Sequence, residues 1–137
     1  MENALPPEDA LIYVMVVASA ADASMSDAEL GLIGGLVRSL PAFRSYESSR
    51  LIETCRTCAA ILQDKDGLDT VLGLVAATLS PRLRETAYAL ACDVAAADGR
   101  LAPEELGLLR RVRAGLGLDR LVATAIERGA HARHQTI

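Results

Sequence analysis

One short pattern of residues occurs twice in the chain, and this repeat constrains the fold more than any other feature of the sequence. The first copy, SAADASMSDAELGLI, covers residues 19–33, and the second copy, AAADGRLAPEELGLL, covers residues 95–109. A shift of 76 residues places Asp22 on Asp98, and each Asp is followed seven residues later by a Glu-Leu-Gly-Leu segment. Each copy therefore predicts a helix that ends near the Asp, a turn, and a second helix that begins near the Glu.

Proline and glycine residues divide the rest of the chain into helices. Pro7, Pro81 and Pro103 each stand where proline is favoured, at the first turn of a helical pattern. Gly115 and Gly117 are expected to close the helix that Pro103 begins. We expect seven helices, at residues 7–22, 26–40, 46–62, 66–79, 81–98, 103–117 and 120–129, followed by a frayed tail at about 131–137.

The segment LIYVMVV, residues 11–17, has the β-branched content of a strand. Its counterpart in the second copy of the repeat is AYALACD, which is rich in alanine and typical of a helix. We therefore expect residues 9–22 to form a helix that is apolar nearly all round, and hence buried.

The composition favours the same fold class. The chain has 137 residues, of which 51% are hydrophobic, but it has no tryptophan and a single phenylalanine. A core of alanine, leucine and valine suits closely packed helices better than a sheet. The sequence predicts an all-α protein with one domain over residues 1–137, in which two repeated helix–turn–helix units are joined by two linking helices.

The acidic turn of the second copy resembles the second half of a calcium-binding EF-hand loop. In that loop the ligands stand at positions 1, 3, 5, 7, 9 and 12, with glycine at position 6. Asp98, Gly99 and Glu105 fit positions 5, 6 and 12. Positions 1 and 3 fall on Val94 and Ala96, which have no side-chain oxygen. In the first copy the same two positions fall on Ala18 and Ala20, which also lack one. The sequence therefore excludes an ordinary EF-hand.

Two interpretations of the repeated acids remain open. Ser26 and Glu29 form the pattern of a capping box, in which the Glu starts a helix and has no other role. The Asp residues are less easily explained, because a carboxylate at a helix C-terminus opposes the helix dipole at a cost of about 0.3–1 kcal/mol. Nearby arginines or a bound metal ion would offset this cost. A metal site would be formed by Asp22, Glu29, Asp98 and Glu105, whose oxygen ligands suit Ca²⁺, Mg²⁺ or Mn²⁺ better than Zn²⁺.

The two copies, read as ASAADASMSDAELGLI and VAAADGRLAPEELGLLRRVRAGLGLD, resemble the TerB family of tellurite-resistance proteins, from about residue 8 to 130. The fold of this family also occurs in the N-terminal region of DjlA-type co-chaperones. The resemblance implies about seven helices, a cytoplasmic bacterial protein linked to tellurite and stress resistance, and a divalent-metal site at these acids. The first copy departs from the family pattern, because Ala23 stands where glycine is usual.

Charge is unevenly distributed along the chain. The formal net charge is −4, but residues 81–137 contain nine arginines and seven acids. We expect no nucleic-acid binding, since phosphate contacts require clustered Lys and Arg. The arginines form either a solvated surface of mixed charge or a face that meets an acidic partner. No secretion signal or membrane span is apparent, so we expect a cytoplasmic protein.

The cysteines and histidines give no convincing catalytic or zinc site. Cys55 and Cys58 form a single C-x-x-C in a helical segment, where small core residues are expected, as for Cys92. His131 and His134 lie far along the chain from that pair. We therefore expect a protein that is not an enzyme. The first hypothesis is a module that binds a divalent metal, a protein partner or both; the alternative is a metal-independent interaction or homodimerisation module whose acids are structural.

Overall fold

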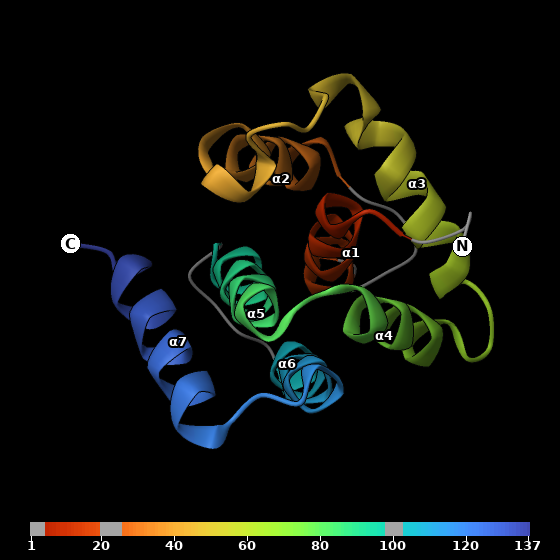
Figure 1. Ribbon diagram of the computed structural model, residues 1–137. Helices are drawn as coiled ribbons and strands as arrows, with labels where there is room; N and C mark the ends of the chain where they lie inside the picture. Colours follow the sequence, from red (N-terminus) through yellow and green to blue (C-terminus); the bar gives the residue numbers. More distant parts are fainter. Residues whose placement is uncertain (1–4, 20–25, 98–102) are drawn as a thin grey trace.

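The computed structural model describes residues 5–19, 26–97 and 103–137, with side chains from residue 106 onwards in the last range (Figure 1). Within these ranges it contains seven α-helices and no strand, which confirms the predicted all-α fold. Two short 3-10 helices, η1 (Pro41–Phe43) and η2 (Ser48–Arg50), connect the second and third helices. The α-helices are α1 (Pro7–Ser19), α2 (Asp27–Ser39), α3 (Leu51–Leu62), α4 (Gly67–Thr78), α5 (Pro81–Ala96), α6 (Pro103–Leu116) and α7 (Arg120–Arg133).

Helix α1 is the centre of the bundle. Every residue from Asp9 to Ser19 is buried, as the apolar sequence of this segment predicts. Figure 1 shows α1 between α5 on one side and α3 on the other, and α1 also contacts α4 and α6. Because this helix has no solvent-facing stripe, the other helices have to cover it on all sides.

The two repeated units, α1–α2 and α5–α6, are unequal in their packing. Their first helices, α1 and α5, form the most extensive helix–helix interface of the described chain. Helix α6 packs against α4 and α5, whereas α2 makes only limited contact with α1. The linking helices α3 and α4 pack against each other and against α1.

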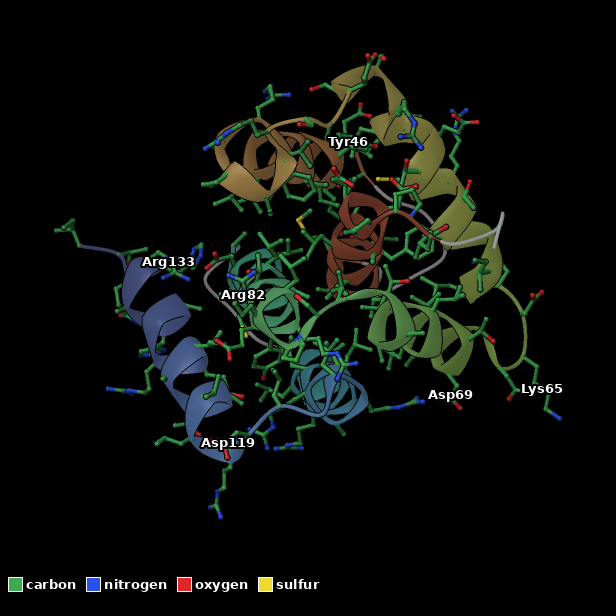
Figure 2. All side chains as sticks on the ribbon, viewed as in Figure 1. Tyr46, Lys65, Asp69, Arg82, Asp119 and Arg133 are labelled. Carbon is green, nitrogen blue, oxygen red and sulfur yellow. The ribbon has the colours of Figure 1, made fainter. Side chains whose placement is uncertain are left out.

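Local signals set most helix boundaries. Ser80 accepts a hydrogen bond from the backbone of Leu83, and Asp119 caps the start of α7 (Figure 2). Gly117 has a φ of 65°, and Leu118 N–H donates to the carbonyl of Arg113, so α6 ends in a Schellman motif.

The sequence assigned a helix-ending role to Gly115 as well, and this prediction is wrong. Gly115 lies inside α6, where a Cβ atom would stand 3.2 Å from side-chain atoms of Leu72 on α4. This glycine therefore allows α6 to approach α4 closely.

Part of the predicted frayed tail at residues 131–137 needs correction, because residues 131–133 belong to a helix. Helix α7 continues to Arg133, whose Nη2 lies 2.7 Å from Oδ1 of Asp93 on α5. His134 Nε2 lies 3.3 Å from the same Asp93 oxygen. Figure 2 labels Arg133 at this end of α7. These contacts fasten the end of α7 to α5 and extend the helix beyond the boundary that the sequence predicts.

Candidate functional site

The structure describes only part of the predicted metal site. Asp22 and Asp98 lie outside the described residues, and so does the side chain of Glu105, whose backbone belongs to α6. Glu29, on the first turn of α2, is the one predicted ligand whose side chain is described. Among the described residues no group of three or more His, Cys, Asp or Glu side chains is placed to hold a metal ion. The metal site therefore stays a prediction.

Glu29 takes part in a complete capping box. Its Oε1 accepts a hydrogen bond of 2.8 Å from the backbone N–H of Ser26, and Ser26 Oγ accepts one of 3.1 Å from the backbone N–H of Glu29. This arrangement satisfies two of the free N–H groups at the start of α2. The structural role predicted for this glutamate is confirmed, and Oε2 is the oxygen that the box leaves for other contacts.

The three cysteines are core residues. Burial raises the pKa of Cys55 to about 11, of Cys58 to about 12 and of Cys92 to about 11. Cys58 Sγ also donates a weak hydrogen bond to the carbonyl of Tyr13 on α1, with a sulfur–oxygen distance of 3.7 Å. The thiols are therefore protonated at neutral pH, and the C-x-x-C pair on α3 has none of the features of a reactive redox pair.

The two histidines lie at the end of α7, and Figure 1 shows α7 and α3 on opposite sides of the α1–α5 pair. The histidines and the C-x-x-C cysteines are therefore not brought together. His131 is hydrogen-bonded to Gln135, and His134 contacts Asp93.

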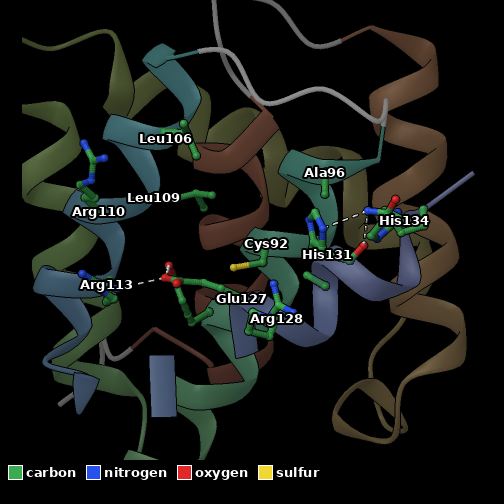
Figure 3. Close-up of a pocket in the computed structure, with 13 residues that line it drawn as sticks. Cys92, Ala96, Leu106, Leu109, Arg110, Arg113, Glu127, Arg128, His131 and His134 are labelled. Atoms are coloured by element: carbon green, nitrogen blue, oxygen red, sulfur yellow. Dashed lines mark hydrogen bonds and ion pairs between the residues drawn. The ribbon is translucent and has the colours of Figure 1, made fainter. Parts of the chain in front are cut away.

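A cavity of about 550 Å³ between α5, α6 and α7 was not predicted from the sequence. Figure 3 shows Leu106 and Leu109 on α6 opposite Cys92 and Ala96 on α5, with residues of α7 along a further side. The described residues that line it are Tyr88, Cys92, Ala96, Leu106, Leu109, Arg110, Arg113, Glu127, Arg128, Ala130, His131, His134 and Gln135.

Glu127 is the centre of a polar network in the wall of this cavity. Its Oε2 accepts a hydrogen bond of 2.5 Å from the hydroxyl of Tyr88. The same oxygen accepts one of 3.1 Å from Nη1 of Arg113, which Figure 3 shows. Burial, followed by the hydrogen bond to Glu127, raises the pKa of Tyr88 far above its ordinary value. Tyr88 therefore remains a neutral donor, and the network connects the three helices through one carboxylate.

The other charged residues of the lining are basic. Arg110 on α6 and Arg128 on α7 are exposed, and neither forms an ion pair with any other described side chain. The concentration of arginine in the C-terminal part of the sequence was the one available signal for this surface. The cavity thus combines an apolar interior with a cationic edge.

The described chain is an all-helical bundle with a cavity between its last three helices, and its sequence repeats one acidic pattern between α1 and α2 and between α5 and α6. The family model described as "Tellurite resistance protein TerB" matches residues 8–127, and the chain therefore belongs to the TerB family. No curated protein and no solved structure matches the chain significantly. Within the described residues, no helix has the length and apolarity that crossing a membrane requires.

Proposed function

We propose that this protein is a cytoplasmic, non-enzymatic module of tellurite and stress resistance that binds a divalent metal at its doubled acidic turn, a protein partner, or both. Membership of the TerB family supports the link to tellurite resistance, and the matched residues include both copies of the acidic turn. The buried, protonated cysteines favour binding over thiol chemistry as the source of this function.

The observation that carries the metal proposal is the packing of the helices that precede the two turns. Helices α1 and α5 form the most extensive interface of the described chain, so each acidic turn follows a helix that is fixed against the other. Asp22, Glu29, Asp98 and Glu105 supply carboxylate oxygens alone, the ligand type that Ca²⁺, Mg²⁺ and Mn²⁺ prefer. A bound cation would also offset the repulsion that the sequence predicts between each Asp and the negative end of the preceding helix dipole.

Thermal unfolding of the metal-stripped protein, titrated with Ca²⁺, Mg²⁺, Mn²⁺ and Zn²⁺ in turn, tests the metal proposal. An ion that binds the folded state raises the unfolding temperature by an amount that grows with ion concentration. We expect a saturable rise with at least one of the first three ions, and its loss in Asp98→Asn. Asp64→Asn is the matched control, because Asp64 is an exposed acid in a turn outside the repeat. A rise that Asp98→Asn leaves intact, or no rise with any ion, contradicts the metal site.

The alternative is a metal-independent interaction or homodimerisation module, and one observation favours it. The carboxylate of Glu29 is already used in a capping box, as a purely structural acid would be. Under this alternative, metal ions leave the unfolding temperature unchanged, and Asp22→Asn or Asp98→Asn leaves tellurite tolerance in cells unchanged. Under the metal proposal both substitutions reduce tolerance.

A further inference from the structure

The cavity between α5, α6 and α7 has the dimensions of a small-molecule site. Its volume of about 550 Å³ falls within the range of roughly 300–1,000 Å³ that is usual for ligand pockets. It is formed by residues from three helices of the bundle, so its walls are held by the packing of α5 against α6 and α7. A ligand could enter without the unfolding of any helix.

The interior is suited to an apolar group. Leu109 and Ala130 are buried, and Cys92 adds a buried, protonated thiol. Leu106, which also lines the cavity, is 40% exposed. An apolar ligand at this position would cover surface that the protein itself leaves in contact with water.

The charges at the edge determine which apolar ligands fit. The described lining contains three arginines and one glutamate, a formal charge of +2 with the histidines neutral. Glu127 does not act as a free anion, because it accepts hydrogen bonds from both Arg113 and Tyr88. Arg110 and Arg128 have no ion-pair partner among the described side chains, and guanidinium groups bind carboxylates strongly through paired hydrogen bonds.

We propose that this cavity binds a small organic anion with an apolar body, of the chemical class of a medium-chain carboxylate. The carboxylate group lies at Arg128, and the hydrocarbon chain lies against Leu106, Leu109 and Cys92, while Arg110 adds positive charge at another edge of the cavity. This proposal is independent of the metal site, since it depends on none of the repeated acids.

Calorimetric titration with three matched probes tests the proposal: decanoate, decanol with the same chain and no charge, and acetate with the same charge and no chain. We expect saturable binding of decanoate that weakens with added salt, and much weaker binding of the other two probes. Equal binding of decanol would remove the role of the arginines, and equal binding of acetate would remove the role of the apolar interior. Either result, or no binding of decanoate, overturns the proposal.

Variants locate the bound probe. Arg110→Gln/Arg128→Gln should weaken decanoate binding by roughly tenfold or more, as expected for the loss of charge-assisted hydrogen bonds. Arg56→Gln/Arg82→Gln removes the same charge from exposed arginines outside the cavity and should leave the affinity unchanged. An equal loss in both double variants would show a general charge effect and contradict the assignment.

Two further experiments separate the cavity from other surfaces. Ala96→Leu adds a side chain at the partly exposed lining position on α5 and should reduce decanoate binding while the circular dichroism spectrum stays that of the native protein. Unchanged binding to such a folded variant places decanoate elsewhere and overturns the proposal. Vesicles of phosphatidylglycerol are the last test: binding to vesicles without binding to monomeric decanoate would identify a lipid surface as the ligand in place of a small anion.

Discussion

Arg50 and Asp9 form an ion pair between η2 and the first turn of α1, with 3.5 Å between Nη2 and Oδ2. Asp9 is buried, and its other oxygen, Oδ1, has no hydrogen-bond partner among the described residues. Burial raises the pKa of Asp9 although Arg50 lowers it, so the folded environment disfavours the charged form of this carboxylate. The guanidinium carbon of Arg50 is also 5.7 Å from the ring centre of Tyr46. This cation–π contact helps to hold Arg50 beside the N-terminus of α1.

This balance predicts that Asp9→Asn stabilises the protein at neutral pH. A carboxyl group with a raised pKa binds its proton more tightly in the folded state, so the wild type gains stability as the pH falls through that pKa. The advantage of Asp9→Asn should therefore shrink from pH 7 downwards and be lost below the ordinary value of 3.8. Urea unfolding of both proteins across this range measures it. If the stability advantage of Asp9→Asn grew towards acid pH, the lowering of the Asp9 pKa by Arg50 would outweigh its raising by burial.

Two glycines should respond in opposite directions to the same change. Gly117→Ala places a side chain at a φ of 65° and should cost about 1–2 kcal/mol. Gly73 lies inside α4, where an added Cβ would meet no other described heavy atom within 4 Å beyond the backbone of its own helix, so Gly73→Ala should stabilise by about 0.5–1 kcal/mol. Chemical denaturation of both variants checks the pair, and a neutral Gly117→Ala would show that α6 does not need its left-handed terminus.

The contact between Asp93 and the end of α7 predicts a local effect. Asp93→Asn should increase amide hydrogen exchange in residues 130–134, because the common partner of Arg133 and His134 on α5 loses its negative charge. The loss in global stability should be at most about 1 kcal/mol, since Arg133 is largely exposed. Unchanged exchange in this segment would mean that packing alone holds the helix end.

The cysteines are predicted to be inert in the folded protein. With pKa values of about 11, 12 and 11, the thiols of Cys55, Cys58 and Cys92 are almost entirely protonated at pH 7 as well as buried. A thiol-specific reagent should therefore modify them at the rate of protein opening, and at once in denaturant. Rapid labelling of Cys55 or Cys58 in the native protein would contradict this prediction.

Helix boundaries were predictable where local residues determine them. Pro7, Pro81 and Pro103 begin helices at the expected positions, and the capping box of Ser26 and Glu29 forms as its pattern predicts. The comparison of the two copies of the repeat predicted a helix at residues 11–17 despite their strand-like composition. The apolar character of that helix predicted its burial.

Features made by distant residues were not predictable in this way. Asp93 and Arg133, whose contact holds the end of α7, are 40 residues apart in the sequence. Tyr88 and Glu127, which form part of the cavity wall, are 39 residues apart, so no local pattern predicts either contact. Gly115 resembled a helix end in sequence, but its neighbour Leu72 comes from another helix. The metal site stays a prediction, because Asp22, Asp98 and the side chain of Glu105 lie outside the described residues.

Equilibrium dialysis of the metal-stripped protein against Mn²⁺ counts the ions bound and tests the metal site at the repeated acids. We predict that the acids of the two copies form a shared site, so binding should be saturable and should be lost in Asp22→Asn and in Asp98→Asn alike, while Asp64→Asn binds as the wild type does. No saturable binding, or binding that survives both substitutions, would contradict a metal site at the repeated turn.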